Sequence, residues 1–142
     1  MRAGDGARVG AVSDPAILLS TTSVYPDSTA SAFDFAAEAG FDGGELMVGV
    51  DQVSLDEEAI AELSDRYRVP VRSLHAPTLL ITQRAWGSDP WGKLQRSAEA
   101  AKRLGADIVV VHPPFRWQRD YGEGFAQGIR ELNRASGVTF AV

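Results

Sequence analysis

The stretch that decides the fold spans residues 89–112 and reads DPWGKLQRSAEAAKRLGADIVVVH. It begins with Asp89-Pro90, which pairs a helix-capping residue with proline at the first helical position. Apolar residues then recur at helical spacing as far as Gly105, a residue type that commonly ends helices. The run from Ile108 to His112 is apolar on both faces, as a parallel strand in a covered sheet requires. The stretch therefore predicts one helix followed directly by one buried strand.

The same alternation of helix and strand extends in both directions from this stretch. Each further strand is a short apolar run, and each helix carries apolar residues at positions i, i+3 and i+4. The repeat length is about 30 residues, the size of a βαβ unit. The other strands are predicted at residues 17–20, 44–48, 71–75 and 138–142.

Start and stop signals bound the remaining helices. Asp27 or Ser28 can cap the first helix, and Gly40 stops it. A capping box of Ser54 and Glu57 predicts the start of the second, because each side chain can satisfy a free backbone N–H group. The apolar stripe of the last helix consists of Tyr121, Phe125, Ile129 and Leu132.

Two architectures fit this alternation, an open doubly wound sheet and a closed barrel, which usually needs about 250 residues. The first strand is not followed by a Gly-x-Gly-x-x-Gly turn, so a dinucleotide-binding Rossmann domain is disfavoured. Both architectures belong to the α/β class, which we predict for this chain, and the alternation alone does not choose between them. Residues 1–14 are Gly- and Ala-rich and predict a flexible leader.

Composition excludes several classes of site. The chain has 142 residues, of which 44% are hydrophobic and 23% charged, as in soluble globular proteins. Its net charge of −5 makes nucleic acid an unlikely partner. Cysteine is absent, so disulfides and thiolate metal sites are excluded. No apolar run approaches the ~20 residues of a membrane span, and no signal peptide is evident, so we predict a cytoplasmic protein without a membrane partner.

The chain has two histidines, and each ends a predicted strand. His75 ends the third strand and His112 the fourth, where the sites of barrels and open α/β sheets gather. Side chains alternate along a strand, so Val71, Ser73 and His75 are predicted to share a face. Neighbouring strands lie about 4.8 Å apart, so both imidazoles can reach one metal or substrate. The alternative is that each histidine is a hydrogen-bonded structural residue.

Glu45 is a carboxylate inside an otherwise apolar strand, and a buried charge needs a partner or a ligand. We therefore predict either a catalytic role for Glu45 or an ion pair with an arginine inside the barrel.

The loops after the third and fourth strands carry arginine and tryptophan. Arginine binds phosphate or carboxylate groups, and tryptophan can stack on a sugar or a base. The alternative is that the tryptophans pack the loops together and the arginines are solvated. The substrate-binding candidates are Arg84, Trp86, Arg116, Trp117 and Arg119.

With these residues placed, the sequence resembles the xylose isomerase-like barrel superfamily. This group includes sugar (phosphate) isomerases and epimerases, inosose dehydratases and the endonuclease IV type of apurinic DNA repair enzyme. The motifs that carry the resemblance are GFDGGEL at residues 40–46, LHAP at residues 74–77 and VVVHPP at residues 109–114. In the family, histidines at these strand ends bind metal or contact the substrate. The resemblance implies such roles for His75 and His112. It also implies the fold: the N-terminal half of a (β/α)8 TIM barrel, truncated to about four βα units plus the start of strand five, in residues 15–142.

The resemblance also implies the activity. It points to an isomerase or epimerase of a sugar or sugar phosphate that uses a divalent metal (Mn, Zn, Mg or Co), with further ligands on later strands. One alternative is an apurinic-site endonuclease, which the acidic charge disfavours. Another is a non-catalytic fragment that needs a partner chain, because a half barrel leaves its outer strands unpaired and open to self-association.

Overall fold

The computed structural model describes residues 14–142, so the predicted leader lies outside the described residues apart from Asp14. Five parallel strands form one sheet in the order β1-β2-β3-β4-β5, each pairing with the next along the chain. The strands are β1 (Leu18–Ser20), β2 (Gly43–Met47), β3 (Val71–His75), β4 (Ile108–Val110) and β5 (Thr139–Ala141).

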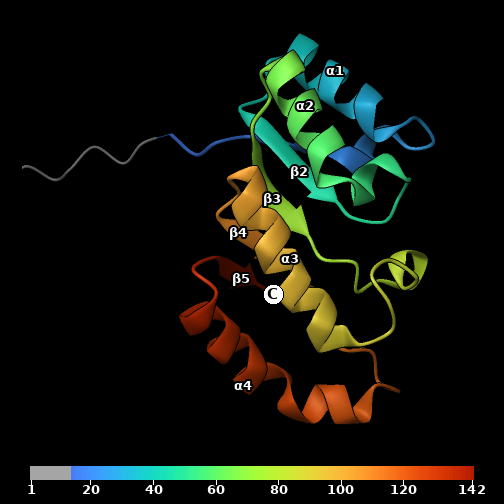
Figure 1. Ribbon diagram of the computed structural model, residues 1–142, viewed down its shortest axis with the longest axis vertical. Coiled ribbons are helices and arrows are strands. Elements are labelled where there is room, and N and C mark those ends of the chain that lie inside the picture. The colour runs from blue at the N-terminus through green and yellow to red at the C-terminus, as the bar shows by residue number, and fades with distance from the viewer. Residues whose placement is uncertain (1–13) are drawn as a thin grey trace, which may run out of the picture.

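One α-helix connects each pair of consecutive strands. Figure 1 shows the helices following one another along the sheet, with α1 and α2 at one end and α4 at the other. Among the described residues, no helix combines the length and apolar character needed to cross a bilayer. The α-helices are α1 (Thr29–Ala39), α2 (Glu57–Tyr67), α3 (Pro90–Leu104) and α4 (Arg119–Ala135). Short 3-10 helices are η1 (Thr21–Val24), η2 (Val53–Leu55) and η3 (Leu80–Thr82).

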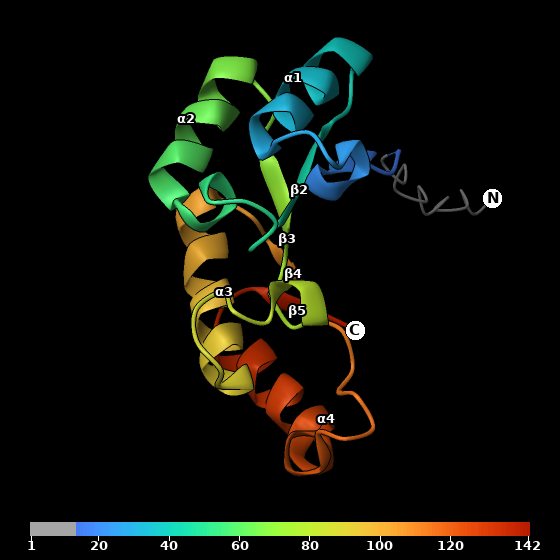
Figure 2. The same ribbon diagram turned by 90° about the vertical axis from the view of Figure 1, so that its right-hand side faces the viewer.

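The helices cover one face of the sheet, which identifies the architecture. Figure 2 shows α2 and α3 on the same side of the strands. The helix-facing row of Leu46, Leu74, Val109 and Phe140 is buried in the core. On the opposite face, Ile108 is 39% exposed. A doubly wound sheet carries helices on both faces, whereas a barrel wall carries them only outside, so the sheet is part of a barrel wall.

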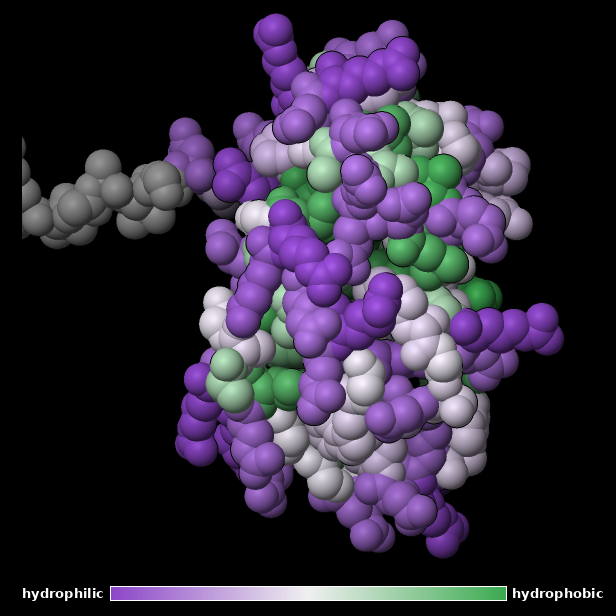
Figure 3. All heavy atoms as spheres, in the orientation of Figure 1, coloured by the Kyte–Doolittle hydropathy of each residue, from purple (hydrophilic) through white to green (hydrophobic). Residues whose placement is uncertain are grey.

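The outward surfaces of the helices are polar, as amphipathic helices on a barrel wall require. Figure 3 shows mostly hydrophilic atoms on this side of the molecule, with limited apolar areas between the helices. The core beneath draws on every strand and on all four α-helices. The outer layer therefore supports the sheet and leaves the other face for chemistry.

A bulge in β3 corrects the predicted face of one residue. Gly44 pairs with Val71, but the next residue, Glu45, pairs with Ser73, so β3 contains one extra residue at this point. Paired residues of parallel strands point to the same side of the sheet. Val71 therefore lies in the helix-facing core, while Ser73 and His75 lie on the inner face. The prediction that all three share a face is wrong for Val71.

The start of α2 also differs from the prediction. Asp56, not Ser54, is the N-cap, and its carboxylate accepts hydrogen bonds from the backbone N–H groups of Glu58 and Ala59. Ser54 is buried in η2, where its hydroxyl accepts a hydrogen bond from the N–H of Gly49. The predicted capping box is wrong because the chain makes a 3-10 turn before the helix begins.

Other helix ends follow the sequence signals. Ser28 caps α1, Gly40 ends it in the left-handed conformation, and Asp89 caps α3 ahead of Pro90. Three predicted strands are too long. β1 begins after Ile17, which is exposed, β4 ends two residues before His112, and β5 lacks the predicted first and last residues, Val138 and Val142.

Candidate functional site

Three ionisable side chains meet at the carboxyl end of the central strands. Glu45 lies on β2, His75 is the last residue of β3, and His112 follows β4. Glu45 and His75 share the inner face because both belong to rows that continue across the sheet on that side. The inner face of the sheet therefore carries these polar groups, while the side chains on the helix-facing side fill the core.

Glu45 holds the His75 ring by a hydrogen bond. Nδ1 of His75 lies 3.3 Å from Oε1 of Glu45, and the Ser73 hydroxyl donates to the other carboxylate oxygen at 3.2 Å. The bond from His75 lowers the pKa of Glu45 below its ordinary value, against the opposing effect of burial. Glu45 is therefore a carboxylate at neutral pH, which can only accept hydrogen bonds. The partner of Glu45 is a histidine, not the arginine that the sequence left as an alternative.

This bond assigns the tautomer of His75. Since a carboxylate accepts, the proton of neutral His75 sits on Nδ1, and Nε2 carries the lone pair. The side chain of His75 is only 10% exposed, and its buried Nε2 has no hydrogen-bond partner among the residues that the structure describes. A carboxylate that orients an imidazole in this way is common behind metal-binding histidines.

His112 brings a second imidazole beside the first. The ring centroids of His75 and His112 lie 5.0 Å apart with the planes inclined by 29°. Unlike His75, His112 is exposed to solvent. The two rings are thus close enough to contact the same small ligand, His75 from a buried position and His112 from an exposed one.

The described residues supply part of a metal site. Among residues 14–142, no group of three or more His, Cys, Asp or Glu side chains is arranged to hold a metal ion. The unpartnered Nε2 of His75 and the neighbouring ring of His112 are suitable donors for a divalent metal. A complete site would need further ligands.

The candidates in the loop after β3 do not join the histidines. Arg84 is exposed. Trp86 packs against the hydrophobic core, and the guanidinium of Arg96 on α3 lies 4.9 Å from the centre of its ring. Trp86 therefore packs the loop against the protein, as the alternative interpretation predicted, and does not present a stacking surface to a substrate.

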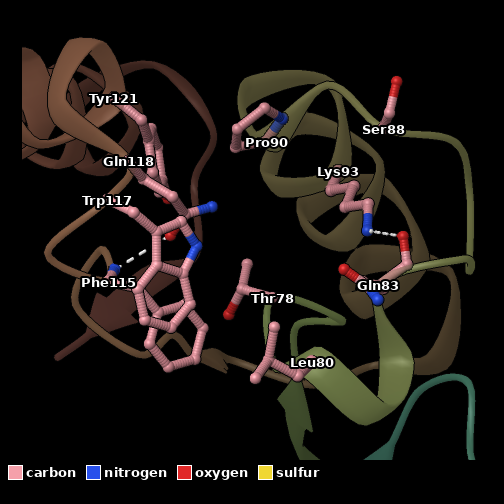
Figure 4. Close-up of a pocket in the computed structure, with 10 residues that line it drawn as sticks. All are labelled: Thr78, Leu80, Gln83, Ser88, Pro90, Lys93, Phe115, Trp117, Gln118 and Tyr121. Carbon is pink, nitrogen blue, oxygen red and sulfur yellow. Dashed lines mark hydrogen bonds between the residues drawn. The ribbon is translucent and has the colours of Figure 1, made fainter.

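The candidates in the loop after β4 lie in the open. Arg116 and Arg119 are exposed, and Arg119 is the first residue of α4. Trp117 is 66% exposed and stacks on Phe115, with ring centroids 4.7 Å apart and planes inclined by 1°. This pair forms one wall of a pocket between the loops that follow β3 and β4, shown in Figure 4.

The pocket contains two residues that the sequence did not single out. Lys93 is buried although it carries a charge, and Tyr121 is buried although it carries a hydroxyl group. Lys93 directly precedes Leu94 of the apolar stripe of α3. Because a lysine at the edge of such a stripe usually extends into solvent, nothing in the sequence indicated that Lys93 is buried. Tyr121 was assigned only to the apolar stripe of α4. Only the fold brings the two together.

Comparisons with known proteins agree with this geometry. A family model described as xylose isomerase-like TIM barrel matches residues 33–142. The chain belongs to this family. The predicted resemblance and the predicted fold class are both confirmed.

The matching curated relatives are mycobacterial. The uncharacterized protein ML2432 of Mycobacterium leprae is 59% identical over 124 residues. The uncharacterized protein Rv0498 of Mycobacterium tuberculosis is 57% identical over the same length. In both comparisons the match covers 87% of this chain and 44% of the relative. The chain thus spans less than half the length of these relatives.

A solved structure supports the fold. The crystal structure of an AP endonuclease, family 2, from Brucella melitensis matches 89% of this chain and 54% of its own chain with a TM-score of 0.62. The sequence identity is 17%, so this likeness concerns the fold alone.

Proposed function

We propose that the chain supplies the Glu45–His75–His112 site of an enzyme that isomerises or epimerises a sugar or sugar phosphate with the help of a divalent metal. The observation that carries this proposal is the buried, unpartnered Nε2 of His75, held in place by Glu45 and lying beside His112. Membership of the xylose isomerase-like family supports an enzymatic role.

Each residue has a role that its surroundings suit. Glu45 is a positioning residue, since it fixes the ring and the tautomer of His75. Nε2 of His75 can accept a hydrogen bond from a substrate hydroxyl or bind the metal. His112 offers its imidazole from the solvent side. A divalent metal (Mn, Zn, Mg or Co), when bound, polarises carbonyl and hydroxyl oxygens of the substrate.

The loop after β4 suits the recognition of a sugar. The exposed indole of Trp117 can stack on a sugar ring. Arg116 and Arg119 are also exposed, and their guanidinium groups can pair with a phosphate. Arg84 remains a weaker candidate for the same task.

Turnover measurements test the proposal. The chain is incubated with a panel of aldoses, ketoses and their phosphates, with each of the four metals, and interconversion is followed by NMR. His75→Ala and His112→Ala should each lower turnover by at least about 10- to 100-fold, the usual cost of losing a residue that supports a metal site. Asp34→Asn, an exposed change on α1, is the control and should have no effect.

Three results would contradict the proposal. If turnover were unchanged in both histidine variants, the assignment of the site to His75 and His112 would be wrong. Nicking of abasic-site DNA without any sugar turnover would favour the endonuclease alternative, and neither activity would favour a non-catalytic fragment that needs a partner chain.

Two further properties belong to the same proposal. A cytoplasmic location is tested by fractionating cells that express the tagged chain. Among the described residues, β1 and β5 each pair with a single strand. Self-association through these edges is tested by analytical ultracentrifugation over a range of concentrations.

A further inference from the structure

A small pocket is lined by the loops that follow β3 and β4. It opens between the loop after β3, the start of α3, the loop after β4 and the start of α4, and its volume is about 140 Å³. Neither histidine lines it. In Figure 4, Lys93 of α3 faces Tyr121 and Trp117 across the pocket, with Thr78 and Leu80 along one side.

Lys93 gives the pocket a positive charge without a counter-ion. Its side chain is buried, and Nζ donates hydrogen bonds to the backbone carbonyls of Pro77 at 3.1 Å and Gln83 at 2.6 Å. An ammonium group has three N–H donors, so one is left over. Among the described residues, no carboxylate lies within 4.0 Å of this nitrogen. Burial lowers the pKa of Lys93, which an anionic partner would reverse.

Two hydroxyl groups in the same pocket also lack partners. The side-chain oxygens of Tyr121 and Thr78 are buried, and neither makes a hydrogen bond to any residue between 14 and 142. Tyr121 as a whole is only 7% exposed. Burial raises the pKa of Tyr121 to about 12, so its hydroxyl remains a donor at neutral pH. Buried polar groups are normally paired, so a ligand that reached both hydroxyls would supply the partners they lack.

We propose that this pocket binds the oxyanion of a small ligand, either a phosphate monoester or a carboxylate. One cationic and two hydroxyl donors match the several acceptor oxygens of such a group. Ordered water could satisfy the hydroxyls, since one water needs only about 10–15 Å³, but it would leave the buried charge uncompensated. The pocket is larger than one water requires and admits an oxyanion.

The rim of the pocket suits the rest of such a ligand. Trp117 and Phe115 stack on each other and form one wall, and Trp117 is largely exposed. A sugar or another flat group attached to the oxyanion can therefore lie on the indole. The proposal does not depend on the chemistry assigned to His75 and His112.

Titrations of the full 142-residue chain test this pocket. Inorganic phosphate and acetate are added separately at constant ionic strength, and the amide and indole N–H signals are followed by NMR. We expect saturable shifts at Thr78, Lys93, Tyr121 and Trp117, with a dissociation constant below about 10 mM for at least one of the two anions. The anion that saturates identifies the class of ligand.

Variants separate the pocket from other anion sites. Tyr121→Phe removes only the hydroxyl and should weaken binding about 5- to 10-fold, the usual effect of one hydrogen bond. Tyr67→Phe makes the same change on α2, outside the pocket, and should leave binding unchanged. Lys93→Met keeps the stem, removes the charge and should abolish saturation.

The design remains decisive if Lys93→Met does not fold. In that case Tyr121→Phe and Thr78→Val carry the test, because each deletes an unpartnered hydroxyl and breaks no existing hydrogen bond. The proposal is overturned if neither anion saturates. It is also overturned if the hydroxyl variants bind as well as the parent chain, or if the shifts map to His75 and His112 instead.

Discussion

Replacing Gly128 with alanine should destabilise the protein, although helix propensity alone predicts the opposite. Gly128 lies in α4, where it faces the indole of Trp91 on α3. A Cβ atom at this position would lie 2.1 Å from Cη2 and 2.4 Å from Cζ3 of that ring. Contacts this short require the two helices or the indole to move.

The magnitude follows from two opposing effects. Alanine is more favourable than glycine inside a helix by about 1 kcal/mol. Inserting a methyl group into a filled space costs typically about 1–3 kcal/mol, and more when the neighbour cannot move. Trp91 is constrained, because it packs against the core and meets Tyr121 edge-on with ring centroids 4.9 Å apart. We therefore expect a net loss of about 1–2 kcal/mol in the free energy of unfolding.

Gly124 provides a matched control in the same helix. A Cβ atom at Gly124 would have no neighbour within 4 Å, so Gly124→Ala should raise the free energy of unfolding by about 0.5–1 kcal/mol. Urea denaturation followed by circular dichroism measures both variants under the same conditions. If both variants were stabilised equally, the packing of α3 on α4 described above would be refuted.

Three further predictions concern a cap, the core and the acid range. Asp56→Ala should lower the free energy of unfolding by about 1 kcal/mol in the same denaturation assay, and an unchanged midpoint would contradict its role as N-cap of α2. Leu94→Ala should cost about 2–5 kcal/mol, because the side chain is fully buried; a smaller loss would mean that the site is less tightly packed than described. The pKa of Glu45 is lower in the folded state than its ordinary value of 4.5. The ionised carboxylate therefore contributes fully to stability above pH 4.5, and this contribution is lost as the pH falls through the lower folded-state pKa. Thermal melts of Glu45→Gln should therefore show less loss of stability on acidification than melts of the parent chain, and identical pH profiles would contradict the assigned pairing.

Local signals in the sequence were sufficient for much of the fold. Asp89-Pro90 and Gly40 mark helix ends by short-range backbone chemistry, and the structure places helix ends at both. The apolar run that begins at Ile108 predicted a parallel strand, because such a strand is covered on both sides in a closed barrel. These signals depend on neighbours within a few residues, which the sequence displays directly.

Other features depend on contacts that the sequence does not display. The bulge between Val71 and Ser73 arises from the pairing of β3 with β2, and no residue type in β3 predicts it. Ser54 and Asp56 are both good caps, and the preceding 3-10 turn decides between them. The burial of Lys93 depends on two backbone carbonyls in the loop after β3.

The same distinction holds for the site. The positions of His75 and His112 at strand ends follow from the strand pattern, and the structure brings their rings together. The hydrogen bond from His75 to Glu45 was not predicted, because it spans 30 residues and depends on the register that the bulge sets.

The central claim is that Glu45 fixes His75 with its proton on Nδ1 and leaves Nε2 free beside His112. Long-range ¹H–¹⁵N correlation spectra of the imidazoles measure the tautomer directly, with Glu45→Ala as the comparison and Zn²⁺ added as the probe. We predict an Nδ1–H tautomer for His75 that becomes mixed in Glu45→Ala, and Zn²⁺-induced shifts at Nε2 of His75 together with shifts in the His112 ring. A protonated Nε2 in the parent chain, or a His75 ring that Zn²⁺ leaves unchanged, would contradict the claim.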